Sequence, residues 1–204
     1  MIIIDMGSGE TCQNDEHIVQ RMIDELAAVC THKDEVVLKW QLFEEMPTLE
    51  PLRHEVYAYA VAYAEKKDFK TTASVFDGPS LEYLIKWKPP FIKLACREYL
   101  LRYLKTIERH DIKAIVSIAS PNRKSYIGKA NYLCCVPKYP ASPNEYESMF
   151  WGNLSVGISD HTSDFRLYTK YQPWIYESHF KLEDSIGADA GPWSKTPAQW
   201  REIL

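Results

Sequence analysis

Two histidines stand beside acidic residues near the end of the chain. His161 directly follows the apolar segment "VGISD", and His179 lies near the end of the segment "WIYESHF". Short apolar runs of this kind are typical of buried strands. If the two runs are neighbouring strands of a barrel, their ends lie about 5 Å apart, so both imidazoles could bind one metal ion. Two nitrogens with oxygens and water would suit Mn²⁺, Mg²⁺, Fe²⁺ or Zn²⁺; the alternative is that each histidine is a structural hydrogen-bonding residue.

Two lysines interrupt hydrophobic runs earlier in the chain. Lys39 lies in "VVLKWQLF" and Lys93 in "FIKLAC". A charged group inside an apolar strand is costly to bury without a partner. Each lysine alone could extend its amine to water from the end of a strand. Two of them, together with hydroxyl groups at other strand ends, favour a site for a phosphate or carboxylate.

The elements that must position these residues alternate along the chain. Eight short runs rich in β-branched residues predict strands at 1–5, 36–40, 71–76, 91–95, 114–118, 130–136, 155–160 and 174–180. Helical patterns lie between most of them, at 15–30, 48–67, 79–87, 97–110, 143–151, 163–171 and 196–204. The nearly continuous apolar runs are typical of strands that are buried on both faces. This alternation predicts an α/β fold, and a (β/α)8 TIM barrel in particular.

The predicted barrel is compact, with shortened or missing helices. TIM barrels usually need about 250 residues, and this chain has 204. Segment 119–130, "ASPNRKSYIGKA", is too short and too rich in proline, glycine and serine for a full crossover helix. A doubly wound open sheet is the alternative architecture. No linker or repeat divides the chain, so we expect one domain over residues 1–204.

Composition excludes several classes of function. The net charge of −4 gives no reason to expect nucleic acid or a membrane surface as a partner. No apolar run approaches the roughly 20 residues that span a bilayer, and the N-terminus has no basic region typical of a signal peptide. Five cysteines without a CxxC pair indicate reduced thiols in a cytoplasmic protein.

The active site of a TIM barrel lies at the carboxyl ends of its strands. The polar residues expected there are Asp5, Lys39, Gln41, Ser74, Asp77, Lys93, Cys96, Glu98, Ser117, Tyr139, Ser159, Asp160, His161, Glu177 and His179. Segment 184–193, "DSIGADAGPW", is expected to form a loop over the mouth, where Gly187 and Gly191 would permit movement. The segment could equally be an ordinary surface connection.

The motifs "GISDHT" and "YESHF", preceded by "YLCCVPKYPASPNEY", resemble the N-acetylneuraminate (sialic acid) synthase family. Weaker matches follow the family order along nearly the whole chain, in "VVLKWQLFEE", "ASVFDGPSLEYL", "FIKLACRE" and "GADAGPWSKTPAQW". The resemblance implies a (β/α)8 barrel and a transferase of carbohydrate biosynthesis. Such an enzyme condenses phosphoenolpyruvate with an N-acetylated sugar aldehyde, such as N-acetylmannosamine, and releases phosphate. It also implies a divalent metal cofactor, Mn²⁺ or Mg²⁺.

The family's site residues carry over by position. His161 and His179 would hold the metal. Ser74, Cys96, Ser117 and Ser159 would contact phosphoenolpyruvate together with the two lysines. The implied catalytic set is Asp5, Lys39, Gln41, Lys93, Glu98, Tyr139, Glu177 and Asp189.

Several positions depart from the family pattern. Asp5 stands where the family has glutamate, Cys96 replaces a serine, Arg97 replaces a glycine and Pro137 replaces a polar residue. The phosphate contacts are therefore thinned, and Arg97 could compensate for one of them. The family's C-terminal antifreeze-like domain is expected to be absent. Two alternatives stay open, namely another metal-dependent aldolase or lyase on this barrel, and a non-catalytic sugar-binding barrel.

A tyrosine cluster lies in the second predicted helix. Tyr57, Tyr59 and Tyr63 could pack against the barrel or form the surface of a homodimer.

Overall fold

The computed structural model describes residues 1–119, 129–147 and 156–204. Its strands are β1 (Ile2–Gly7), β2 (Val36–Leu42), β3 (Lys70–Val75), β4 (Ile92–Leu94), β5 (Ala114–Ile118), β6 (Asn131–Cys135), β7 (Gly157–Asp160), β8 (Tyr176–Phe180) and β9 (Ser194–Lys195). Its α-helices are α1 (Gly9–Cys12), α2 (Glu16–Ala27), α3 (His54–Lys66), α4 (Gly78–Lys86), α5 (Leu104–Arg109), α6 (Pro143–Glu147), α7 (Arg166–Tyr171) and α8 (Pro197–Trp200). Short 3₁₀ helices are η1 (Lys33–Glu35), η2 (Glu98–Tyr103) and η3 (Ala188–Ala190).

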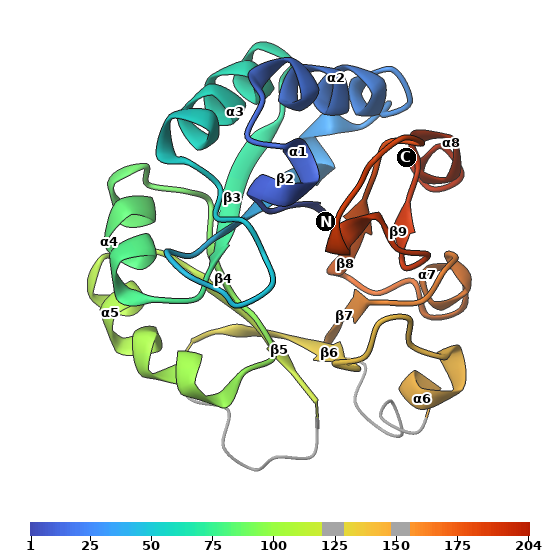
Figure 1. Cartoon of the computed structure of the whole chain (residues 1–204). Coiled ribbons are helices and arrows are strands. Elements are labelled where there is room, and N and C mark those ends of the chain that lie inside the picture. Colours follow the sequence, from blue (N-terminus) through green and yellow to red (C-terminus); the bar gives the residue numbers. More distant parts are fainter. Residues whose placement is uncertain (120–128, 148–155) are drawn as a thin grey trace.

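The first eight strands close into a parallel barrel. Each pairs with the next along the chain, and β8 returns to pair with β1, so that Ile2 lies opposite Tyr176. The helices surround the ring of strands (Figure 1). The predicted (β/α)8 TIM barrel is therefore confirmed, and the open sheet is excluded because β1 is hydrogen-bonded on both sides. The short β9, which the sequence did not predict, adds to β8.

The second predicted helix begins later than the sequence indicates. We expected it from residue 48, but α3 begins at His54. The Asn14 side chain binds backbone groups just before α3. Its Nδ2 donates to Pro51 O (3.0 Å), and its Oδ1 accepts from Arg53 N (2.8 Å). Proline also disfavours the helical conformation in the residue before it. The sequence thus located the helix and misplaced its start.

Other helix predictions agree in position and differ in detail. Asp15 caps α2, with its Oδ1 accepting a hydrogen bond from His17 N (2.7 Å). The helix expected at 97–110 begins as the 3₁₀ turn η2 and continues as α5, and 3₁₀ turns are frequent at helix ends. Residues 120–128 and 148–155 lie outside the described residues, as do the parts of the predicted segments 119–130, 143–151 and 155–160 that fall on them.

The predicted tyrosine cluster packs against α2. Tyr57 is fully buried, Tyr59 donates to Gln20 (3.1 Å), and the hydroxyl of Tyr63 donates to Asp24 (3.0 Å). These contacts join the cluster to α2 within the chain. Among the described residues no helix has the length and apolar character needed to cross a bilayer.

The interior of the barrel is apolar at the amino ends of the strands and polar toward their carboxyl ends. Successive side chains of a strand point to opposite faces, so residues two apart share the inside. At the amino ends, six apolar side chains form a cluster separate from the main core: Ile3, Val37, Phe91, Ile115, Leu133 and Ile175. Two residues further along the same strands stand Asp5, Lys39, Lys93, Ser117, Cys135 and Glu177. An apolar plug thus underlies a polar layer.

Candidate active site at the carboxyl ends of the strands

A cavity of about 480 Å³ opens above the polar layer of the barrel. This volume lies in the range typical of small-molecule sites. All but one of the residues that the family resemblance assigns to the site line it: Asp5, Lys39, Gln41, Ser74, Lys93, Cys96, Ser117, Tyr139, Ser159, His161, Glu177, His179 and Asp189. The exception is Glu98, which is exposed and lines a smaller neighbouring pocket with Cys96 and Arg97. Ala188, Asp189 and Trp193 line the cavity too, so the predicted loop 184–193 does border the mouth.

Lys39 forms the centre of one half of the site. Its Nζ donates to Asp5 Oδ2 (2.6 Å) and Ser74 Oγ (3.0 Å) and lies 3.4 Å from Glu177 Oε1. Its side chain is only 3% exposed. Because both carboxylates contact the ammonium, the charge of this lysine is compensated inside the barrel.

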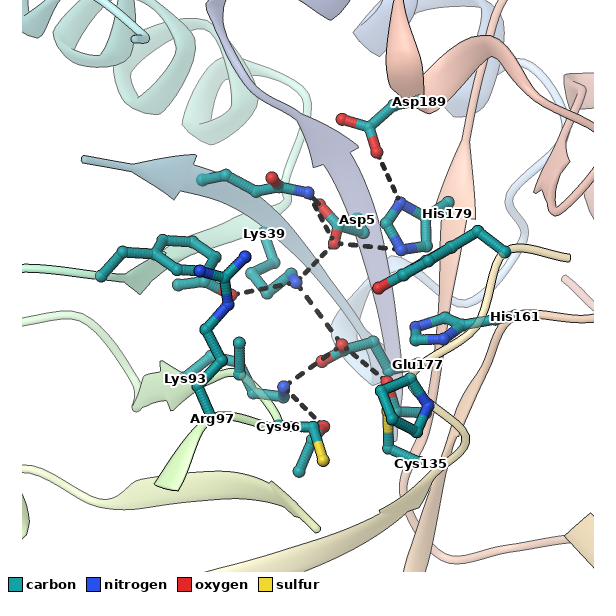
Figure 2. Close-up of a pocket in the computed structure, with 18 of the residues that line it drawn as sticks. Asp5, Lys39, Lys93, Cys96, Arg97, Cys135, His161, Glu177, His179 and Asp189 are labelled. Carbon is teal, nitrogen blue, oxygen red and sulfur yellow. Dashed lines mark hydrogen bonds and ion pairs between the residues drawn. The ribbon is translucent and has the colours of Figure 1, made fainter. Parts of the chain in front are cut away.

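Lys93 occupies the opposite side of Glu177. Its Nζ donates to Ser117 Oγ (2.8 Å) and lies 3.4 Å from the same oxygen, Glu177 Oε1. Ser159 Oγ also donates to Oε1 (3.1 Å). One carboxylate oxygen therefore lies between two lysines (Figure 2). The other oxygen, Oε2, is buried without a hydrogen-bond partner among the described residues.

The charges of these groups support one another. Burial alone would raise the pKa of Asp5 and of Glu177. Lys39 and His179 outweigh burial at Asp5, and Lys39 and Lys93 outweigh it at Glu177, so the pKa of each carboxyl is lowered. Burial lowers the pKa of Lys93, and Glu177 only partly offsets that effect. For Lys39, the carboxylates of Asp5 and Glu177 outweigh burial and raise the pKa. Asp5, Glu177 and Lys39 therefore each favour their charged form inside the barrel.

Asp5 is held in place by hydrogen bonds from the neighbouring strand β2 and from the end of its own strand. Gln41 Nε2 donates to its carboxylate (3.2 Å), as does the backbone N–H of Gly7 (3.1 Å). Gly7 adopts a φ of +81°, and a Cβ there would lie 2.1 Å from Thr11 Oγ1. Only glycine fits this turn, which returns the chain toward α1.

The two histidines meet at the same rim. Their ring centroids are 5.5 Å apart. His161 Nδ1 lies 2.7 Å from Val136 O, which leaves Nε2 for a ligand. His179 Nε2 lies 3.7 Å from Asp5 Oδ2, and its Nδ1 lies 3.2 Å from Asp189 Oδ1. The last contact has the distance of an ion pair, but its geometry is too poor for a hydrogen bond.

The two imidazoles have opposite electrostatic surroundings. Burial and the neighbouring His179 hold the pKa of His161 well below its usual value, so this ring is neutral. Burial also opposes charge on His179, but the carboxylates of Asp5 and Asp189 outweigh it and raise the pKa of that ring. Thr11 Oγ1 donates to Asp189 Oδ2 (3.1 Å) and so orients this carboxylate from α1.

The donor set fits a divalent metal that takes two imidazoles from the protein. A backbone carbonyl or carboxylate on the far ring nitrogen is the usual support of a metal-binding histidine, and here Val136 and Asp189 occupy those positions. Over the described ranges, no group of three or more histidine, cysteine or acidic side chains is arranged to bind a metal ion. The remaining ligands would therefore be water and substrate.

Aromatic rings and one arginine form the mouth. Tyr139 is half exposed and stacks on His161 with ring centroids 4.1 Å apart. Its ring centroid also lies 5.4 Å from that of Trp193. The Arg97 guanidinium lies over the Phe76 ring, 5.3 Å from its centroid, and lines the cavity. No ion pair joins Arg97 to an acidic side chain within the described part of the chain.

Two predicted strand-end acids serve the scaffold instead of the cavity. Asp77 caps α4 by accepting from Ser80 N (2.8 Å) and also binds Glu44 N (2.7 Å). Asp160 points away from the barrel interior and accepts from the Tyr176 hydroxyl (2.6 Å). Alternation along the strand separates it from Ser159 and His161, which face inward.

Fold and site together define a (β/α)8 barrel with a charged cavity at the carboxyl ends of its strands, where active sites of this fold lie. No protein-family model matches the sequence, and no curated protein matches it.

Solved structures share the fold. N-acetylneuraminic acid (sialic acid) synthetase from Leptospira borgpetersenii serovar Hardjo-bovis, in complex with citrate, matches with a TM-score of 0.77 at 20% identity, over 98% of this chain and 80% of that one. Spore coat polysaccharide biosynthesis protein spsE from Bacillus subtilis matches at 0.76 and 20%, over 99% of this chain and 65% of that one. Phospho-2-dehydro-3-deoxyheptonate aldolase from Thermotoga maritima matches at 0.71 and 12%, over 99% and 66%. The resemblance to the sialic acid synthase barrel thus extends to the fold of nearly the whole chain.

Proposed function

We propose that this chain is a sialic-acid-synthase-like transferase that condenses phosphoenolpyruvate with an N-acetylated sugar aldehyde and releases phosphate. One observation carries the proposal. Lys39 and Lys93 flank Glu177 at 3.4 Å on one side of the cavity, and His161 and His179 meet on the same rim with centroids 5.5 Å apart. The fold shared with a sialic acid synthetase supports the same reaction class.

The lysine side of the cavity would bind phosphoenolpyruvate. This substrate carries a phosphate and a carboxylate, and both prefer charge-assisted donors. Lys93, Ser117 and Ser159 lie together around Glu177, and Ser74 stands beside Lys39. Arg97 at the mouth adds a cation that no carboxylate of the described residues neutralises.

The histidine side would bind the aldehyde. A divalent metal, Mn²⁺ or Mg²⁺, between His161 and His179 would act as a Lewis acid toward the aldehyde oxygen. The Asp189 carboxylate lies 3.2 Å from Nδ1 of His179, and Val136 O lies 2.7 Å from Nδ1 of His161, so that Nε2 of each ring is left for the ion. Tyr139 and Trp193 cover this side and would contact the sugar.

Glu177 is suited to the water that the reaction consumes. The enol carbon of phosphoenolpyruvate attacks the aldehyde carbon, and water then adds at the carbon that carries the phosphate. Glu177 Oε2 is a buried acceptor with no partner among the residues that the structure describes, so it can accept a hydrogen bond from that water. Lys39 and Lys93 keep the carboxylate ionised, since they lower its pKa.

Phosphate release tests the proposal. The full chain is incubated with phosphoenolpyruvate, N-acetylmannosamine and MnCl₂, and each component is omitted in turn. We expect release only with all three, and loss of release in Glu177→Gln. The matched control Glu82→Gln, on the exposed face of α4, keeps the activity. Aldol or lyase turnover of another keto acid without phosphate release would favour the aldolase alternative, and binding of the sugar without turnover would favour the non-catalytic one.

A further inference from the structure

Lys195 is a fully buried lysine that does not line the cavity. It lies in β9, opposite Phe180 of β8. Its Nζ donates three hydrogen bonds, to Thr162 O (2.6 Å), to Ser178 Oγ (2.6 Å) and to Trp193 O (3.1 Å). An ammonium group has three donors, so all of them are used within the chain. All three acceptors are neutral, and a buried charge is costly unless its bonds compensate it.

The lysine reaches these acceptors from the outer face of the barrel wall. Glu177 and His179 line the cavity, and successive side chains of a strand point to opposite faces. Ser178, which stands between them, therefore points outward. Its hydroxyl accepts from Lys195 and donates to Asp160 O (3.0 Å). The ammonium is thus tied to both β7 and β8 behind the cavity.

Buried charged side chains bind both polar backbone groups of Thr162. Asp160 Oδ1 accepts from Thr162 N (2.7 Å), and Lys195 Nζ donates to Thr162 O. Asp160, Thr162 and Lys195 are each at most 1% exposed. Hydrogen bonds to charged groups are stronger than neutral ones. The backbone at Thr162, and with it that of the preceding His161, therefore has little freedom to rotate.

The same ammonium links two segments that also meet inside the cavity. Thr162 directly follows His161, and Trp193 lies at the mouth. On the cavity side the Tyr139 ring contacts the rings of both His161 and Trp193. Lys195 joins these two segments from outside the barrel, through their backbone carbonyls.

We propose that Lys195 is a positioning residue that holds the His161 and Trp193 segments of the cavity in place from outside the barrel. It fixes the backbone from which His161 presents Nε2, and it keeps Trp193 at the mouth. The consequence for metal binding rests on the proposed function. Because Lys195 touches neither the metal nor the substrate, its loss should weaken metal binding while both imidazoles remain.

Lys195→Met tests the inference, since methionine is of similar length and has no donor. Measurements are made at pH 7, where the amine is charged, because burial lowers its pKa only to about 8. We expect Mn²⁺ affinity in calorimetric titrations to fall roughly tenfold, the lower end of the effect of losing a partner beyond the ligands. Hydrogen exchange followed by mass spectrometry should be about three- to tenfold faster in segments 160–164 and 190–193, as for one lost hydrogen bond.

Two further variants separate positioning from a general loss of stability. Leu84→Ala opens a space in the buried face of α4, on the opposite side of the barrel from β9 (Figure 1). It should lower the free energy of unfolding but leave Mn²⁺ affinity and exchange in the two segments unchanged. Lys195→Gln keeps an amide donor and should give intermediate values. It also replaces the methionine variant if that protein does not fold.

Unchanged exchange in both segments, or unchanged Mn²⁺ affinity in Lys195→Met, would overturn the inference. An equal loss of affinity in Leu84→Ala would overturn it too, because Lys195 would then act through stability alone. Wild-type protein that binds no Mn²⁺ would refute the proposed metal site. The exchange measurement would in that case decide by itself whether Lys195 positions the two segments.

Discussion

Asp5 and Lys39 stand opposite each other on neighbouring strands and form a buried ion pair, with 2.6 Å between Oδ2 and Nζ. Both side chains are 3% exposed. Removing one partner of a buried pair leaves the other charge without compensation. Lys39 keeps contacts with Ser74 and Glu177, which limits that penalty.

Asp5→Asn should therefore destabilise the fold substantially. We expect a loss of about 3 kcal/mol in the free energy of unfolding, near the lower end for a broken buried pair, measured by urea denaturation at pH 7. Glu25→Gln, which removes the exposed pair of Glu25 with Arg21, is the matched control and should cost at most about 1 kcal/mol. Equal losses in the two variants would contradict the role assigned to the buried pair.

The stability of the protein should fall in acid because of the same residue. The pKa of Asp5 is lowered in the folded state, so the unfolded chain binds more protons than the folded one as the pH falls through the ordinary range of an aspartate, about 4. The stabilisation from Asp5 is thus complete above that range and is lost progressively below it. Urea denaturation at pH 7, 5, 4 and 3 should show a decline that is shallower in Asp5→Asn. An identical pH dependence in both proteins would rule this explanation out.

Binding of Mn²⁺ should require both histidines and should strengthen with pH. His161→Ala and His179→Ala should each reduce affinity at least tenfold in calorimetric titrations, since each removes one of the two protein nitrogens. Asp5 and Asp189 raise the pKa of His179, so the ion must displace a proton from this ring and affinity should rise as the pH increases. His17→Ala, on the exposed first turn of α2, should bind like the wild type. Unchanged affinity in either site variant would refute the shared site.

Arg97 should contribute to anion binding at the mouth. We expect Arg97→Ala to weaken phosphoenolpyruvate binding about tenfold, because a charge-assisted hydrogen bond contributes roughly 1.5–3 kcal/mol. Arg109→Ala, exposed at the end of α5, serves as the control. Isothermal titration without the sugar isolates this step, and equal affinities in the two variants would show that Arg97 does not touch the anion.

The sequence predicted the barrel and most of the cavity because the signals are local. Lys39 and Lys93 interrupt apolar runs, and a charge in a buried strand must face a partner or a cavity. Strand ends in a closed parallel barrel converge by topology, so the sequence alone assigns residues that are far apart along the chain to one rim.

The features that could not be predicted from the sequence depend on which way a side chain points or on tertiary contacts. Cys134 and Cys135 look alike in an apolar run, yet only Cys135 faces the cavity, and counting two residues on from Leu133 of the plug would have identified it. The late start of α3 depends on Asn14, a residue in a distant turn. The exclusion of Glu98 follows from η2, whose 3₁₀ turn begins at that residue and leaves it exposed.

The central claim is that His161 and His179 bind one metal ion beside the lysine-flanked Glu177. Anomalous diffraction at the manganese absorption edge, from crystals grown with MnCl₂, tests it most directly. We expect a single peak in the cavity, about 2.0–2.2 Å from one nitrogen of each ring. A peak bonded to only one of the two histidines, or manganese bound elsewhere with the cavity empty, would contradict it.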